Sequence, residues 1–174
     1  MALINEKFTL RTEMPLTGAT AGIWMTLDTQ EAVDARAAGT GPSVPDENGT
    51  PARGTILRGQ GVTFNAAGNI EKATSVDVTG ALPKLLMVVF AGNNDFSGAF
   101  SNGKVVVIHG GCRFDTEKYG TGPFTPNVPL SLVAGVWTLS VLGDHKQIAG
   151  WVGPRGLRDG VLDVIMPQGV AAGA

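Results

Sequence analysis

Apolar and polar residues alternate along FTLRTEM, residues 8–14, until Pro15 ends the run. Alternation with a period of two is typical of a strand with one buried face. After residue 61, short apolar or alternating runs recur at the spacing of roughly 8 to 12 residues found in sandwiches and barrels. These runs are GVTFN, NIEKA, SVDVT, LLMVVF, VVVI, LSLV, VWTLSVL, QIAGWV and VLDVIM. The pattern predicts an all-β chain, folded as a compact antiparallel β-barrel or sandwich.

One segment carries helix signals. The apolar run IWMTL leads into DTQEAVDARAAG, in which Asp28 and Glu31 have the spacing of a capping box. Gly39 stands where such a helix would end. We therefore expect at most one short helix, between Asp28 and Gly39.

Glycine-containing pairs mark the expected hairpin turns. Gly68-Asn69 would reverse the chain after VTFN, Asn102-Gly103 would lead into VVVI, and Gly143-Asp144 would fold VWTLSVL back onto QIAGWV. The strands VVVI and LLMVVF are apolar on both faces, which requires a closed barrel or a covering subunit.

We expect residues 39–61 to form a long loop, because they contain six glycines and three prolines. Loops of this length are usually functional or disordered. Within it, Ile56 and Leu57 are the candidates for a strand or an anchor. We expect an N-terminal arm, helix and loop over residues 1–61, a β core over 62–166, and a loose C-terminal tail over 167–174.

Composition narrows the classes of partner. The chain has 174 residues, a length that buries a core without disulfides, and its single cysteine excludes an internal one. A formal charge of −2 without a Lys/Arg cluster argues against nucleic acid, and there is no apolar run of about 18 residues for a membrane. Charged residues make up only 16% of the chain, and 25 glycines make it turn-rich. Such a surface is expected to be covered in part by a protein partner.

The stretch VVVIHGGCRFDTEKYGTG holds the candidates for catalysis: His109, Cys112 and Asp115. Neighbouring members are three residues apart, which in a strand places them on opposite faces. A cysteine nucleophile also needs a base and oxyanion donors, and no family signature surrounds Cys112. We expect Cys112 to be a small buried residue.

Other chemical candidates have simpler explanations. One cysteine and two histidines lack any zinc-ligand spacing, and GNNDFSG, residues 92–98, lacks the acidic alternation of a calcium loop. Arg155 and Arg158 lie in an expected solvated loop. We predict that the tryptophans pack in the core rather than bind sugar; they are Trp24, Trp137 and Trp151. No catalytic, cofactor or metal site is expected.

The order of features from Leu82 to Met166 carries a resemblance. A strand ending in FAGNNDFSGA is followed by GKVVVIHGG, FDTEKY, the turn PLSLVAGVW, IAGWVG and a last strand GVLDVIM. In this order the segment resembles the head decoration, or cement, proteins of tailed bacteriophages. The resemblance leaves the N-terminal part unassigned.

The resemblance implies a compact β-barrel without enzymatic activity, made in the host cytoplasm and located on the exterior of the capsid. It implies two partners: the major capsid protein and further copies of the chain in a small symmetric homo-oligomer, a dimer or a trimer. The leading strand could pair with a sheet edge of the capsid through main-chain hydrogen bonds, and the long loop is a second candidate. The expected contact residues are Phe8, Leu10, Arg11, Arg53, Leu57 and Arg58.

Two other functions stay open. One is a different structural part of the virion, such as a tail tube or neck subunit. The other is a small hydrolase that depends on Cys112, which would require an exposed and acidic thiol.

Overall fold

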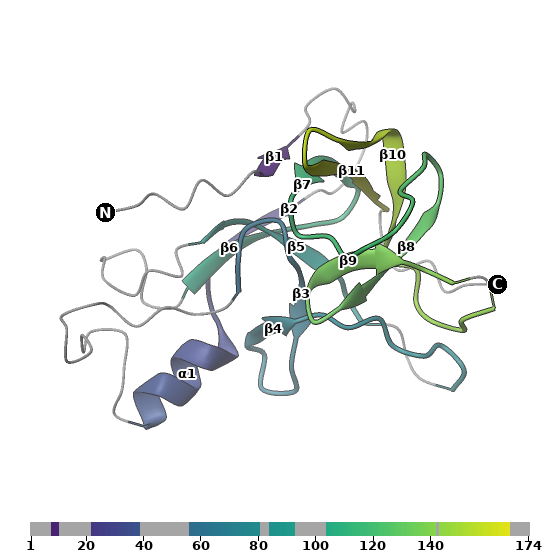
Figure 1. The fold of residues 1–174 in the computed structure, drawn as a ribbon. Coiled ribbons are helices and arrows are strands. Elements are labelled where there is room, and N and C mark those ends of the chain that lie inside the picture. The colour runs from purple at the N-terminus through teal and green to yellow at the C-terminus, as the bar shows by residue number, and fades with distance from the viewer. Residues whose placement is uncertain are drawn as a thin grey trace.

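The computed structural model contains strands in two antiparallel sheets and one short helix (Figure 1). The residues that it describes are 8–10, 22–38, 56–80, 84–92, 104–141 and 143–167. The all-β prediction is confirmed. Of the two expected forms, a barrel and a sandwich, the strands are compatible with a sandwich. They divide into two sheets instead of closing into one barrel.

The six-stranded sheet has the order β1-β7-β11-β10-β8-β9. Its strands are β1 (Phe8–Leu10), β7 (Cys112–Thr116), β11 (Val161–Met166), β10 (Gly150–Arg158), β8 (Pro129–Val133) and β9 (Val136–Leu139). The five-stranded sheet has the order β2-β6-β5-β3-β4. Its strands are β2 (Gly22–Asp28), β6 (Lys104–His109), β5 (Met87–Gly92), β3 (Gly61–Phe64) and β4 (Ile70–Lys72). Both sheets thus include strands from residues 1–61.

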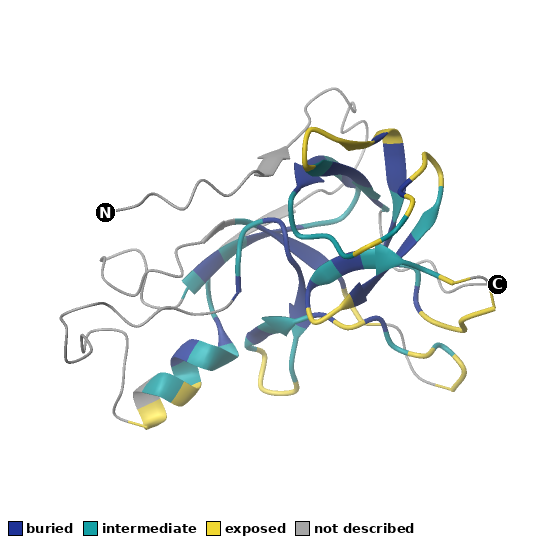
Figure 2. Ribbon diagram, viewed as in Figure 1, coloured by how far each residue is buried: buried dark blue, intermediate teal, exposed yellow. Residues whose placement is uncertain are grey.

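Two hydrophobic clusters bury both faces of the central strands (Figure 2). Val88 of β5 and Ile108 of β6 enter a large cluster that the two sheets share, around the ring pair of Phe114 and Trp137. Other side chains of the same two strands enter a second cluster with β3 and β4; they are Met87, Val89, Val105 and Val107. The chain itself therefore covers strands that are apolar on both faces, and their composition is no argument for a covering subunit.

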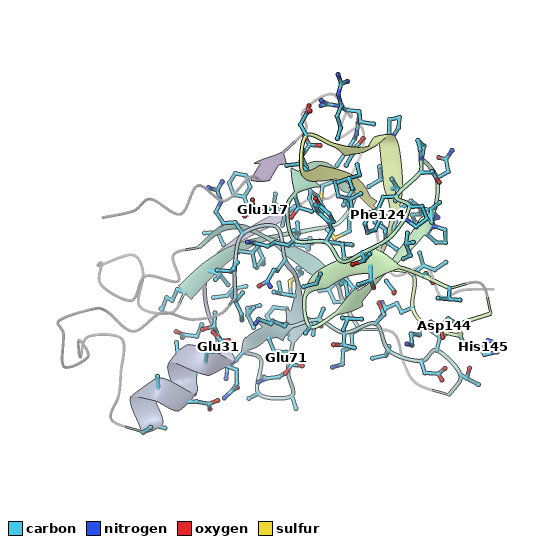
Figure 3. All side chains as sticks on the ribbon, in the orientation of Figure 1. Glu31, Glu71, Glu117, Phe124, Asp144 and His145 are labelled. Atoms are coloured by element: carbon cyan, nitrogen blue, oxygen red, sulfur yellow. The ribbon has the colours of Figure 1, made fainter. Side chains whose placement is uncertain are left out.

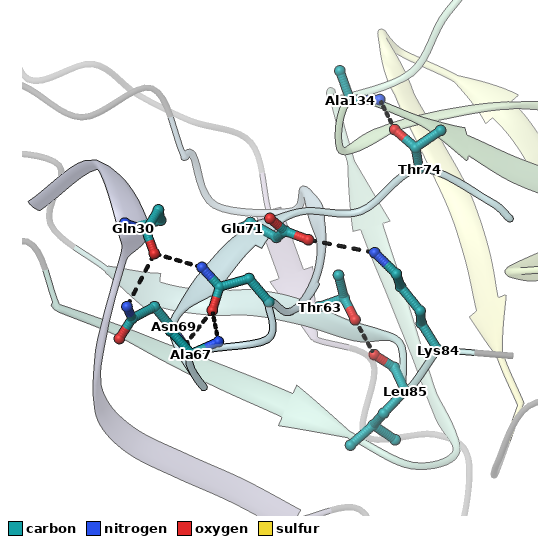
Figure 4. Close-up of polar contacts among 10 residues, drawn as sticks. Gln30, Thr63, Ala67, Asn69, Glu71, Thr74, Lys84, Leu85 and Ala134 are labelled. Atoms are coloured by element: carbon teal, nitrogen blue, oxygen red, sulfur yellow. Dashed lines mark hydrogen bonds and ion pairs between the residues drawn. The ribbon is translucent and has the colours of Figure 1, made fainter. Parts of the chain in front are cut away.

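The helix α1 (Gln30–Ala37) begins one residue later than the capping-box spacing indicated. The hydroxyl of Thr29, not Asp28, accepts a hydrogen bond from the backbone N–H of Ala32 at 3.2 Å. The same N–H also bonds to the backbone carbonyl of Thr29 at 3.1 Å, so Thr29 caps the first turn with both of its oxygens. The amide of Asn69 donates to the side-chain oxygen of Gln30 at 3.0 Å and ties the helix start to the β3–β4 hairpin (Figure 4).

Of three hairpins whose turns are described, one lies at a predicted position and two do not. β3 and β4 form the hairpin expected at Gly68-Asn69. Ala134-Gly135 joins β8 to β9, and Asp159-Gly160 joins β10 to β11, with positive φ at both residues of each turn. Such two-residue turns match the right-handed twist of the paired strands.

The chain does turn at Gly143-Asp144, where φ of Gly143 is positive and the N–H of Asp144 donates to the carbonyl of Val141 at 2.9 Å, but the strand pairing predicted for this turn is wrong. β10 pairs with β8, through Gly150 opposite Leu130, and not with β9. The segment VWTLSVL therefore does not fold directly back onto QIAGWV, because β8 lies between their strands. The expected turn at Asn102-Gly103 lies outside the described residues.

Candidate interaction surface

The catalytic candidates His109 and Cys112 belong to different sheets. His109 ends β6 in the five-stranded sheet, Gly110-Gly111 carries the chain across, and Cys112 begins β7 in the other sheet. Cys112 is only 2% exposed, and its burial raises the pKa of its thiol to about 12. At neutral pH such a thiol is protonated. As expected, Cys112 is buried, and in this state it is unsuited to act as a nucleophile.

The third catalytic candidate, Asp115, is itself buried and belongs to a group of charges on β7, β10 and β11. Arg113 donates two hydrogen bonds to the carboxylate of Asp163, from Nε at 2.8 Å and from a terminal nitrogen at 2.7 Å. The backbone N–H of Arg155 donates to the same carboxylate at 3.0 Å. The guanidinium of Arg155 also lies 3.8 Å from the carboxylate of Asp115, which is directly opposite Asp163 in the strand register.

The ionised form of Asp163 is stabilised despite its location. Its side chain is 1% exposed, and burial alone would raise the pKa of this carboxyl. The hydrogen bonds from Arg113 and Arg155, together with their positive charges, outweigh burial and hold the pKa below its usual value. A carboxylate held in this way by two parallel bonds fixes how β7 lies against β11.

An irregularity in β10 makes room for this carboxylate. The register of β10 on β11 shifts between Val152 and Leu157, as in a β-bulge. A Cβ added to Gly153 would lie 2.4 Å from the carboxylate of Asp163. A glycine at this position therefore allows β10 to pass over the ion pair. Arg155 and Arg158, expected in a solvated loop, instead belong to this strand.

The end of the long loop is anchored, as Ile56 and Leu57 suggested. Ile56 is buried in the second cluster. Residues 57–60 form a turn in which the side chain of Gln60 accepts a hydrogen bond from the N–H of Leu57 at 2.7 Å. Nε of Arg58 donates to the carbonyl of Phe90 at 3.2 Å. Leu57 and Arg58 are therefore held half-buried on the body of the protein.

Thr116 connects this turn to the N-terminal strand. β1 pairs with β7 in a register that places Phe8 opposite Thr116 and Leu10 opposite Phe114. The hydroxyl of Thr116 donates to the carbonyl of Gly59 at 3.2 Å. The indole N–H of Trp137 donates to the same carbonyl at 2.9 Å, which fixes the turn further.

Two of the expected contact segments are thus neighbours. β1 contains Phe8 and Leu10, and the turn at 57–60 contains Leu57 and Arg58. We name this region, β1 together with residues 57–60 and Thr116, the β1 edge. Glu117, labelled in Figure 3, follows Thr116 in the sequence. It forms an ion pair of 3.1 Å with Lys118. Arg11 and Arg53 lie outside the described residues.

A second surface feature is a groove of about 560 Å³ that includes the loop at Asp144 and His145 (Figure 3). Its apolar lining includes Val78, Val128 and Val141, of which Val141 is 66% exposed. Sequence analysis did not find this groove, because its walls come from segments far apart in the chain. It is a second candidate for contact with a partner.

Sequence reasoning also missed Thr116, Gly59 and the pairing of Arg113 with Asp163. One signal was present: Asp163 interrupts the apolar strand VLDVIM, and a charge inside a buried strand usually has a charged partner. Of the tryptophans expected in the core, Trp137 is fully buried and Trp151 is half-buried, and the side chain of Trp24 is outside the described part.

In the described part of the chain, no cluster of three or more His, Cys, Asp or Glu side chains is placed to hold a metal ion. The helix of this part is not long and apolar enough to cross a membrane. Comparison with known proteins identifies no relative: no family model, no curated protein and no solved structure matches the chain.

Proposed function

We propose that this protein is a non-enzymatic part of a tailed-phage virion that binds the outer surface of the capsid and stabilises it. The observation that carries the proposal is the meeting of two expected contact segments at the β1 edge, through Thr116. The ordered resemblance of residues 82–166 to capsid decoration proteins supplies the class of partner, the major capsid protein.

The chemistry of the β1 edge suits the addition of a strand. β1 is the terminal strand of its sheet, and β7 is its strand partner among the described residues. A terminal strand offers main-chain N–H and C=O groups on its outer side, and an extended segment of another protein can pair with them. Such pairing needs no particular side chains on the capsid. Arg58, close by, adds a positive charge that can select an acidic neighbour.

Rigidity of the surface favours binding. The turn at 57–60 is fixed by bonds to Thr116, Trp137 and Phe90, so it loses little freedom when a partner binds. A protein that binds the assembled shell and not its free subunits shifts the equilibrium toward assembly. Many copies of a modest contact would therefore raise the thermal resistance of the shell.

The test is co-sedimentation with expanded, undecorated heads. We expect the intact protein to bind and to raise the temperature at which the heads open. Arg58→Glu should weaken binding by about tenfold, whereas Arg158→Glu, an identical charge change at a residue 70% exposed on the β10–β11 hairpin, should not. Circular dichroism must show that both variants are folded.

Deletion of residues 1–14 removes β1 and should abolish binding while the other strands remain folded. A variant of the groove, Val141→Asp, serves as a second control and should bind normally. If Val141→Asp loses binding while Arg58→Glu keeps it, the contact is the groove and not the β1 edge. If the intact protein does not bind heads and forms rings or tubes by electron microscopy, the tail or neck function replaces this proposal.

A further inference from the structure

The first two strands of the chain belong to different sheets. β1 lies at the edge of the six-stranded sheet, whereas β2 lies at the edge of the five-stranded sheet. Residues 11–21 connect them. β1 is thus joined to the rest of its own sheet by main-chain pairing with β7 and not by a short hairpin.

The connection is longer than the distance that it must span. Leu10 lies opposite Phe114, and Gly22 lies opposite His109. Five residue steps separate His109 from Phe114, so the two positions are at most about 17 Å apart, and each pairing adds about 5 Å. The twelve residue steps from Leu10 to Gly22 can extend to about 40 Å, which exceeds that limit of about 27 Å. The β7 edge of a second molecule is therefore within reach of β1 when it lies within about 40 Å of Gly22.

β7 does not depend on β1 for its position. On its other side it pairs with β11 over five positions, from Cys112 to Thr116, whereas β1 pairs with it over three. The bidentate bond from Arg113 to Asp163 holds β7 on β11 as well. When β1 leaves, the edge of β7 stays formed and can accept another strand in the same register.

We propose that β1 exchanges between two copies of this chain, so that the β1 of one copy pairs with the β7 of the other. The occupant is known, because the strand that fits this edge is the one that the structure places on it. Exchanged and unexchanged forms make the same hydrogen bonds, so exchange is a low-cost route to an oligomer. The tethered strand competes at an effective concentration of about 1 mM, so exchange requires protein at a similar local concentration. This inference does not depend on capsid binding.

Cysteine pairing between two variants tests the exchange. Thr9 lies opposite Asp115, and opposed Cα atoms of an antiparallel pair have a separation that a disulfide can bridge. Thr9→Cys, in a chain lengthened by a tag, is mixed with Asp115→Cys at about 1 mM and oxidised. We expect a mixed disulfide between the two chains, at least tenfold more abundant than with Thr79→Cys, a control at an exposed position. Cys112 can remain, because it is buried.

The double variant Thr9→Cys/Asp115→Cys supplies the second measurement. Oxidised at low concentration, it closes within one chain, and the locked protein should then give no exchange at about 1 mM until it is reduced. The proposal is overturned if the mixed disulfide does not exceed the Thr79→Cys control while the double variant closes fully within its own chain. A second outcome also overturns the proposal: locking abolishes head binding and no mixed disulfide forms. In that case a capsid strand, and not a second copy of the chain, occupies the β7 edge.

Discussion

Replacing Arg113 with methionine tests the contribution of the ion pair with Asp163. Methionine keeps much of the apolar stem but removes both hydrogen bonds to Asp163, whose side chain is 1% exposed. Removing one partner of a buried pair costs about 3–5 kcal/mol, and we expect a value near the lower end because the backbone N–H of Arg155 still donates to this carboxylate. For a domain of this size, each kcal/mol lowers the melting temperature by about 2–4 °C, so we expect a loss of about 10 °C.

The loss of unfolding free energy caused by Arg113→Met should become smaller as the pH falls. In the native protein the folded-state pKa of Asp163 lies below its unfolded value, so its stabilisation is present above the unfolded pKa. That stabilisation is lost as the pH falls through the folded pKa. Without Arg113, burial raises the pKa relative to the native protein, so the carboxyl takes up its proton at a higher pH and the penalty disappears. The difference in stability between the two proteins should therefore narrow between pH 7 and about pH 4.

Urea denaturation, followed by tryptophan fluorescence, measures both effects, since Trp137 is fully buried. The matched control is Arg158→Met, which removes an exposed pair of 3.6 Å with Asp159 and should change the free energy of unfolding by less than about 0.5 kcal/mol. A loss below about 1 kcal/mol for Arg113→Met at pH 7, or a loss that stays constant from pH 7 to pH 4, would refute the reasoning.

Three further predictions concern single positions. Gly153→Ala should lower the free energy of unfolding by about 1–3 kcal/mol, measured by urea denaturation, because the new Cβ would overlap the carboxylate of Asp163; unchanged stability would contradict the described bulge. Cys112 should react with a thiol reagent at least about a hundredfold more slowly in native than in urea-unfolded protein, because burial raises its pKa to about 12; equal rates would show an exposed thiol. Thr29→Ala should destabilise by about 1 kcal/mol in a thermal melt and Asp28→Ala by less, since Thr29 is the N-cap; the reverse order would restore Asp28 as the cap.

The β1 edge connects the two proposals of capsid binding and strand exchange. Capsid binding uses the outer side of β1, whereas strand exchange uses the side that faces β7. The two uses are compatible, because an exchanged β1 still presents its outer side. Copies bound next to one another on a shell are at high local concentration, which is the condition that exchange requires. The experiments distinguish the two proposals, because the mixed disulfide is measured in the absence of phage heads.

The sequence by itself determined the local features of this protein. Apolar and alternating runs identified most of the strands, although the run SVDVT forms only an isolated bridge, between Asp77 and Lys146. Gly68-Asn69 identified the β3–β4 turn, because side-chain direction and backbone freedom are properties of neighbouring residues. Cys112 was expected to be buried because no base, oxyanion donors or family signature accompanies it in the sequence, and it is buried.

Only the tertiary structure decided which strands pair and which distant residues meet. The chain pattern suggested that VWTLSVL folds back onto QIAGWV, but β8 separates β9 from β10. Arg113 and Asp163 are 50 residues apart, and Thr116 and Gly59 are 57 apart, so nothing local in the sequence links them. Such contacts depend on how two sheets bury a common core, and many strand orders satisfy the same alternation of apolar residues. The β1 edge therefore follows from packing and not from any motif.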